Sequence, residues 1–483
     1  MISLDDYTSH DALGLAERIA AGDMQVDEVL DAAERAIARV NPTLNAVLQV
    51  LPPDSRGPAS APKAPFYGVP FAIKELTIAA AGVRSDMGSR LTAGFTPQAD
   101  STLMARFRNA GLVLVATTQT PEVGYNPTTE PLLHGPVRNP WGLHLSAGGS
   151  SGGSGAAVAA GMMPLAHAND GGGSIRIPAA CNGLVGLKPT RDRIPTGPGS
   201  SDPLCGLAVD FAVTRSVRDC AALLDAVAGP DPGAPSVSIP PAKPWRTLIE
   251  RPPERLRIAF TTRAPSGASA DAECVEATLN TARLLEQLGH EVSPDAPVFD
   301  WDEFLNAVHV IWCAATAAAL DGVAHGLGRV PGPDNLEAVT WACYQDGRRR
   351  SAADLLGALA FQNLLSRSVA PFFERYDVLL TPTLARVAAP LGELDQNRAG
   401  LSAIEWTRQV FSYCPFTPLC NSTGQPAISL PLHVSTAGIP VGVQFIGRFG
   451  DETLLLRLAR QLEQAAPWHG RRPTCHAAMA GAR

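Results

Sequence analysis

Residues 146–155 read Ser-Ala-Gly-Gly-Ser-Ser-Gly-Gly-Ser-Gly, and residues 171–178 read Gly-Gly-Gly-Ser-Ile-Arg-Ile-Pro. The first run is short and lies between segments of structured composition, which disfavours a flexible linker. It lacks the Gly-Lys-Ser/Thr ending of a phosphate-binding loop. Glycines allow close backbone packing, and N–H groups beside a hydroxyl at the start of a helix favour a developing oxyanion. The run is therefore compatible with a nucleophile site.

Strand-like and helical segments alternate on both sides of these runs. Strand composition is found at residues 68–74 and 112–116, with a helical segment at about 101–110 between them. This alternation predicts an α/β layer architecture. Further helices and strands are expected at 271–288, 304–320, 376–381, 427–431 and 452–464.

The N-terminal residues 11–40 carry apolar side chains at helical spacing, which predicts two amphipathic helices. Asn41-Pro42 is expected to end the second helix, because the residue before a proline avoids helical geometry.

The chain is longer than one small core can organise, although large α/β enzymes often form one body. We expect residues 1–483 to form a single domain. A proline-rich stretch at 229–253 is expected to connect two parts of it at the surface. The catalytic core would span about 65–225, and a helical region at about 254–375 would shape the pocket.

Composition excludes several classes of protein. The net charge of -7 argues against a nucleic-acid surface. The nine cysteines include no Cys-x-x-Cys pair, so neither a disulfide framework nor a metal-binding motif is indicated, and a reducing cytoplasm is expected. The acidic N-terminus lacks the features of an export signal. The longest apolar stretch, 304–320, is shorter than a bilayer span and predicts a buried helix rather than a membrane segment.

Only four of the 39 basic residues are lysines, so each lysine needs a reason. Lys74 follows an apolar strand-like run, where burial would lower its pKa and supply a neutral amine, which arginine cannot do. The simpler alternative is a lysine at a strand end that reaches solvent, and position alone favours it. Lys188 has equally apolar neighbours, so composition does not choose between the two.

The two glycine-serine runs together resemble the amidase signature. Ser174 lies 24 residues after Ser150, as in that family, and Lys74 stands in a segment that resembles the family's lysine motif. The resemblance extends over essentially the whole chain through the segments 118–122, 186–190 and 424–427. It implies an α/β/α sandwich around a central mixed β-sheet, and it implies that Lys188 is structural.

The resemblance also implies a mechanism for cleaving an amide. Ser174 would attack the carbonyl carbon. Ser150, which the family holds beside a non-proline cis peptide, would pass the proton of Ser174 to neutral Lys74 and later return it to the departing amine. Water would then hydrolyse the acyl-enzyme, so neither a metal nor a cofactor is needed.

An oxyanion hole is implied at the N–H groups of Gly171, Gly172, Gly173 and Ser174. Gly171 departs from the family pattern, where threonine or isoleucine is common, and this departure is expected to loosen the loop. No cluster of Arg or Asp is seen beside the motifs, which gives a mild preference for an uncharged substrate.

Within the family the chain is similar to bacterial amide and urethane hydrolases, including hydrolases of nylon oligomers. That comparison implies that Cys313, after Trp312, lines the pocket. The simpler interpretation of Cys313 is a core cysteine on a buried helix, and sequence alone favours it. Tyr125 and Asn126 are weaker candidates for the pocket. The expected partners are a small-molecule amide or carbamate and water, and a homodimer is left open.

Four alternatives stay open. An ester or carbamate hydrolase would use the same three side chains. A Gly-x-Ser-x-Gly hydrolase, which residues 148–152 match loosely, would need a catalytic histidine from the set His290, His309, His325, His433 and His469. A catalytic subunit of a tRNA-dependent amidotransferase would need partner subunits and glutamine. A binding protein that has lost catalysis is disfavoured, because all three side chains are present.

Overall fold

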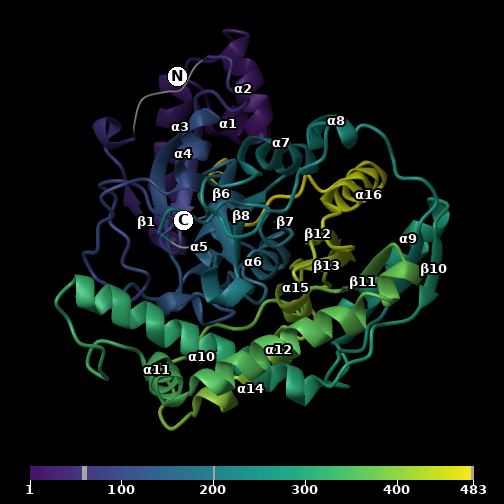
Figure 1. The fold of residues 1–483 in the computed structure, drawn as a ribbon. Helices are drawn as coiled ribbons and strands as arrows, with labels where there is room; N and C mark the ends of the chain where they lie inside the picture. Colours follow the sequence, from purple (N-terminus) through teal and green to yellow (C-terminus); the bar gives the residue numbers. More distant parts are fainter. Residues whose placement is uncertain (57–61, 200–201, 480–483) are drawn as a thin grey trace.

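An eleven-stranded mixed β-sheet, flanked by helices, runs through the molecule (Figure 1). The structure is a computed structural model, and it describes residues 1–56, 62–199 and 202–479. The strands follow the order β1-β3-β2-β6-β8-β7-β12-β13-β11-β9-β10. This arrangement confirms the predicted α/β class and the mixed sheet.

The strands of the large sheet are β1 (Val47–Val50), β2 (Val69–Lys74), β3 (Leu112–Thr118), β6 (Leu165–Asp170), β7 (Val185–Lys188), β8 (Val209–Thr214), β9 (Arg257–Phe260), β10 (Glu291–Pro294), β11 (Val378–Pro382), β12 (Ala427–Val434) and β13 (Pro440–Gly447). A separate hairpin consists of β4 (Arg138–Asn139) and β5 (Gly142–Ser146). β2 is parallel to both β3 and β6, whereas β8, β7, β12 and β13 pair antiparallel with their neighbours.

The helices before the proline-rich connection are α1 (Leu4–Ser9), α2 (Ala12–Ala20), α3 (Val26–Leu44), α4 (Thr102–Asn109), α5 (Gly152–Ala159), α6 (Arg176–Asn182) and α7 (Val217–Val227). The later helices are α8 (Trp245–Leu248), α9 (Ala272–Gln287), α10 (Trp301–Gly326), α11 (Ala338–Arg349), α12 (Ala352–Val369), α13 (Phe372–Arg375), α14 (Ala403–Tyr413), α15 (Pro418–Thr423) and α16 (Glu452–Ala465). Capping boxes at Ser351 and Ser402 begin α12 and α14.

The predicted end of the second N-terminal helix is wrong. α3 continues through Pro42 to Leu44, and Asn45 closes it in the left-handed conformation. A proline so close to the helix end disrupts little of the hydrogen-bond ladder. The Asn41 side chain accepts from the N–H groups of Ala46 and Val47, which fixes the turn into β1.

Two buried clusters divide the core between the sheet and the later helices. β9, β10 and β11 follow the proline-rich connection in sequence and extend the same sheet. Helices α10, α11, α12 and α14 gather along one edge of the molecule, at the bottom of Figure 1. Of these helices, α10 and α14 contribute side chains to the cavities beside Ser174.

α10 is longer than the apolar stretch that predicted it. Its 26 residues give the whole helix the length and composition of a membrane span, although the predicted stretch 304–320 within it is shorter. Its most apolar window is 61% buried within the described residues. It packs on α11, α12 and α14. The helix is therefore a core helix of the fold.

Gly347 lets α11 approach α10 closely. A Cβ atom at this position would lie 2.6 Å from the carbonyl carbon of Cys313. Since the obstacle is backbone, no side-chain rotation relieves it.

We expect Gly347→Ala to lower the free energy of unfolding by about 1–3 kcal/mol, because α11 must move away from α10. The matched control is Gly322→Ala on α10, where a Cβ meets no atom within 4 Å. This control should leave stability unchanged or raise it by up to about 1 kcal/mol, since alanine favours helix more than glycine does. Urea unfolding followed by circular dichroism checks both. Equal stability of the two variants would contradict the close contact.

Candidate active site

The carboxyl ends of β2 and β6 bring Lys74 and Asn169 together. The two strands are parallel neighbours with Ala72 opposite Ala166, so their last residues meet at one edge of the sheet. The Lys74 Nζ atom lies 2.5 Å from Asn169 Oδ1 and 2.7 Å from Ser150 Oγ. Lys74 is fully buried. The lysine amine is thus fixed between an amide oxygen and a serine hydroxyl.

Burial lowers the pKa of Lys74 to about 7, and the negative charges of Asp210 and Asp170 offset part of this effect. Asp210 stands on β8 directly opposite Asn169. It accepts hydrogen bonds from Thr77 and pairs with His167 Nε2 at 3.0 Å. A neutral amine at Lys74 is therefore accessible near neutral pH.

Lys188 has the same burial but different neighbours. Burial, and then the charge of Arg176, lowers its pKa to about 7 as well. Its Nζ atom donates to the carbonyl oxygen of Pro189 at 2.8 Å. Lys188 is not among the residues that line the cavities at Ser174. The pKa therefore does not distinguish the two lysines. They differ in position, because the Lys74 amine lies against the Ser150 hydroxyl.

Ser150 and Ser174 lie just before the first residues of α5 and α6. The peptide bond between Gly149 and Ser150 is cis, as the resemblance implied. A Cβ atom at Gly149 would lie 2.6 Å from the carbonyl oxygen of Asn126, so the backbone approach requires glycine. Ser150 and Ser174 line the same cavity of about 440 Å³. Among the described residues the Ser174 hydroxyl has no hydrogen-bond partner.

The backbone N–H groups of the loop 171–174 differ in whether they are already hydrogen-bonded. The N–H of Gly173 donates to Asp170 Oδ1 at 2.7 Å and is already engaged. The N–H groups of Gly171, Gly172 and Ser174 make no hydrogen bond within the described part of the chain. Three of the four amides expected in an oxyanion hole are therefore free to bind an anionic oxygen.

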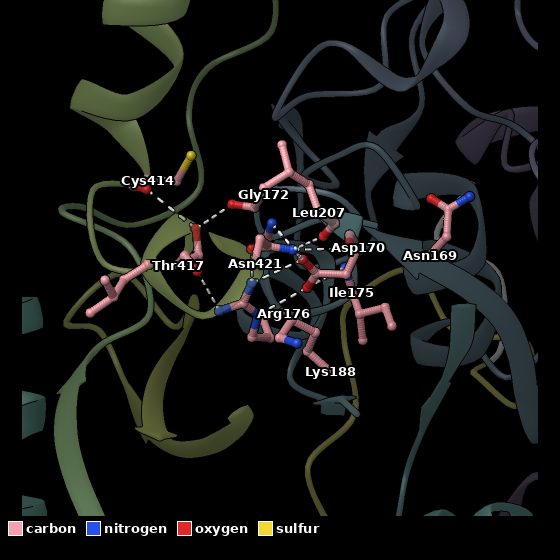
Figure 2. A network of polar contacts seen from close by, with 12 residues as sticks. Asn169, Asp170, Gly172, Ile175, Arg176, Lys188, Leu207, Cys414, Thr417 and Asn421 are labelled. Carbon is pink, nitrogen blue, oxygen red and sulfur yellow. Dashed lines mark hydrogen bonds and ion pairs between the residues drawn. The ribbon is translucent and has the colours of Figure 1, made fainter. Parts of the chain in front are cut away.

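A buried ion pair holds this loop in place (Figure 2). Arg176 donates to both carboxylate oxygens of Asp170 at 2.9 Å, and both side chains are fully buried. Burial opposes ionisation of Asp170, but the charge and hydrogen bonds of Arg176 outweigh it and lower the pKa of Asp170 to about 2. Asn421 and Thr417 bridge the pair and the loop to α15 and its N-terminal flank. The ion pair therefore fixes the loop that carries Ser174, and neither of its side chains is among the residues that line the cavities at Ser174.

Two cavities meet at Ser174. The smaller one, about 20 Å³, is lined by Tyr125, Asn126 and Gly172 among others. The larger one has a wall of mostly apolar side chains. These include Leu76, Met87, Val123, Leu204, Trp312, Ala315, Ala319 and Leu320. Asp202 is the one charged residue lining it among the described residues.

The three predicted pocket residues have different placements. Tyr125 and Asn126 line the smaller cavity, and the ring of Tyr125 stacks on Trp312 with 4.8 Å between the centroids. The Asn126 side chain binds Thr128 and the carbonyl of Leu394. Cys313 is buried and is not among the residues that line either cavity.

Sequence reasoning did not single out Asn169 or the residues of α10 that line the larger cavity, although it expected a helical region at about 254–375 to shape the pocket. Asn169 ends an apolar strand-like run, a position that points to the carboxyl edge of a sheet and could have identified it. No such signal marks Trp312, Ala315 or Ala319, because a helical spacing does not say which part of the molecule a face contacts.

No histidine lines the two cavities in the described part of the chain. His309 contacts Asp346 and Thr407, and His290 contacts Gln461. Two groups of side chains have donor atoms close enough to share a metal ion. They are His309, Cys313 and Asp346, and Glu75, Asp86 and His134.

Comparisons with known proteins agree with this geometry. The family model Amidase matches residues 28–456. The 6-aminohexanoate-cyclic-dimer hydrolase of Paenarthrobacter ureafaciens is 38% identical over 476 residues, covering 96% of both chains. The enzyme of the same name from a Pseudomonas species is 37% identical over 476 residues, also covering 96% of each. A solved structure of 6-aminohexanoate cyclic dimer hydrolase complexed with substrate superposes with a TM-score of 0.92 at 36% identity, covering 97% of this chain and 99% of the other. The chain therefore belongs to the amidase signature family and is an enzyme that hydrolyses amide carbon–nitrogen bonds.

Proposed function

We propose that hydrolysis proceeds through an acyl-enzyme on Ser174, with Ser150 as the proton relay and Lys74 as the base. The observation that carries this proposal is the 2.7 Å contact between Lys74 Nζ and Ser150 Oγ, beside the cavity that Ser174 also lines. A lysine with a pKa of about 7 accepts a proton near neutral pH. The absence of any histidine from the described cavity linings disfavours a histidine-based mechanism.

The proton then follows a short path. Ser150 gives its proton to neutral Lys74 and takes the proton of Ser174, whose oxygen attacks the amide carbon. As the carbon–nitrogen bond breaks, the path reverses and the amine leaves with a proton. A water molecule repeats the cycle on the ester bond and frees Ser174. Asn169 accepts a hydrogen bond from Lys74 and keeps its amine directed at Ser150.

The oxyanion is assigned to the N–H groups of Gly171, Gly172 and Ser174. The N–H of Gly173 instead donates to Asp170, so its contribution is to fix the loop. A donor of this kind contributes about 3 kcal/mol to stabilising the transition state. The positive ends of α5 and α6 near the two serines act in the same direction.

The apolar cavity favours an uncharged amide with an apolar chain or ring. Its volume of about 440 Å³ and its wall from α10 suit a molecule of moderate size. The similarity to the two cyclic-dimer hydrolases supports oligoamides as the substrate class. Carbamates and esters are the second candidate, because the same serine and lysine would act on them. A cytoplasmic location is part of the proposal, since all nine cysteines, each in the described residues, are unpaired.

Substitution of the proposed nucleophile and base tests the mechanism. We expect Ser174→Ala and Lys74→Ala each to lower kcat/KM for a nitroanilide by at least about 10³-fold, because neither step of acyl transfer proceeds without them. Lys188→Met is the matched control. It removes an equally buried lysine whose one hydrogen-bond partner among the described residues is the carbonyl oxygen of Pro189. The folded fraction of the control should keep wild-type activity.

The same measurement separates the candidate substrates. Rates on matched nitroanilide, nitrophenyl ester and nitrophenyl carbamate compounds distinguish an amidase from an esterase or a urethanase. Retention of nitroanilide cleavage by Lys74→Ala would refute the proton relay.

The charge of Asp210 provides a second test of the base. Activity requires neutral Lys74, so kcat/KM should be low at acid pH and rise as the pH passes about 7. Asp210 stabilises the ammonium form, so Asp210→Asn should lower the pKa of Lys74 and move the acid limb of the profile to lower pH. The pH dependence of kcat/KM checks this.

Asp219→Asn is the control for the loss of a buried carboxylate. Asp219 binds the N–H groups of Ala12 and Leu13 and is not among the charges that act on Lys74. Its profile should keep the wild-type acid limb. A shift of the same size in both variants would mean that the limb does not report Lys74.

A further inference from the structure

A compact group of metal-type side chains lies between α10 and α11, separate from the proposed catalytic residues. We call it the α10–α11 cluster, and it consists of His309, Cys313 and Asp346. His309 and Cys313 are one helical turn apart on one face of α10, and Asp346 is on α11. The close approach at Gly347 brings the two faces together.

The distances within the cluster are those of atoms around a shared centre. His309 Nε2 lies 3.1 Å from Asp346 Oδ2, and Cys313 Sγ lies 3.9 Å from His309 Nε2. The donor atoms of these three residues are all within 4.8 Å of one another. Three donors from two helices can thus surround one ion.

The contacts of His309 suit a metal-bound imidazole. His309 Nδ1 lies 3.0 Å from Thr407 Oγ1. With Nε2 on a metal, the Nδ1–H group would donate to Thr407, which is the usual outer contact of a metal-bound histidine.

The other metal-type group is less suited to an ion. Glu75 already accepts from the N–H groups of Asp86 and Gly88, and Arg84 pairs with Asp86. In the α10–α11 cluster Arg350 pairs with Asp346, whereas His309 and Cys313 pair with no arginine among the described residues. The Asp346 side chain is 24% exposed, which gives an ion a path from solvent to otherwise buried donors.

We infer that the α10–α11 cluster is a binding site for a divalent cation of the zinc type. Zn²⁺ prefers nitrogen, sulfur and carboxylate ligands in tetrahedral sites, and three protein ligands leave the fourth position to water. Each thiol that binds the ion loses its proton to the buffer. The site assists no step of the proposed mechanism, so it would be structural or regulatory.

A bound ion would lie one contact behind the substrate cavity. Tyr125 Oη lies 2.5 Å from Thr407 Oγ1, the same atom that His309 contacts. Tyr125 and Trp312 stack and line the smaller cavity at Ser174. Occupancy of the site would therefore hold the aromatic wall of the pocket in one position. This link to turnover rests on the proposed function, whereas ion binding does not.

Co²⁺ is the probe that tests the inference. The full chain, stripped of metal with a chelator and kept reduced by a phosphine, is titrated with Co²⁺ while the thiolate-to-cobalt charge-transfer absorption is recorded. We expect one equivalent to bind, Zn²⁺ to displace it, and Zn²⁺ to raise Tm, since a ligand of the folded state stabilises it. Absence of the absorption band in the wild-type protein would overturn the proposal, whatever the enzyme activity.

Variants locate the site. Asp346→Asn and Cys313→Ser should each weaken Co²⁺ binding by at least about 10-fold. Asp346→Asn is nearly isosteric and partly exposed, so it tests the site even where Cys313→Ser fails to fold. Cys205→Ser and Cys475→Ser, at the two less buried cysteines, are the controls and should keep the band. Loss of the band in a control, or its retention in both cluster variants, would place the ion elsewhere and refute the proposal.

Discussion

The buried ion pair of Asp170 and Arg176 is the interaction on which the rest of the site depends. A carboxylate with no solvent contact is tolerated only where its oxygens are bonded, and here a guanidinium, backbone N–H groups and the Asn421 amide share them. One carboxylate thereby ties the end of β6 to the glycine loop and to α15. Arg176 extends the connection to Gln444 on β13. The loop that carries Ser174 is thus held from several elements distant in sequence.

The same burial that requires this ion pair sets the chemistry of Lys74. Burial away from water destabilises the ammonium form of Lys74, and the negative charges of Asp210 and Asp170 offset part of this effect. Without those carboxylates the amine would be a weaker base, and without burial it would stay protonated at neutral pH. Asp210, across the sheet from Asn169, therefore raises the proton affinity of the Lys74 amine, although it is not among the residues that line the larger cavity. The fold therefore sets the protonation of the Lys74 amine through the places it gives to Lys74, Asp170 and Asp210.

The sequence predicted much of the fold, because strand-like and helical runs are local. Strand composition located β2 and β3, whereas Lys74, Ser150 and Ser174 come from the resemblance to the amidase signature, and their catalytic roles are part of our proposal. Composition did not separate Lys74 from Lys188, since both are buried at strand ends and differ only in what tertiary structure brings near them. A helical region at about 254–375 was expected to shape the pocket, but the residues of α10 that line the cavity were beyond reach for the same reason. α3 continues past the end predicted at Asn41-Pro42, so the avoidance of helical geometry before a proline did not decide where this helix ends.

Gly171, in the glycine loop before Ser174, lies against the wall of the larger cavity. Its backbone does not need glycine, because its φ angle is not in the left-handed region. A Cβ atom there would lie 3.0 Å from Leu204 Cδ1 and 3.1 Å from the Trp312 ring, both of which line the larger cavity. The threonine or isoleucine that the resemblance led us to expect here would fill space in the larger cavity. The absence of a side chain at Gly171 therefore leaves this part of the cavity open.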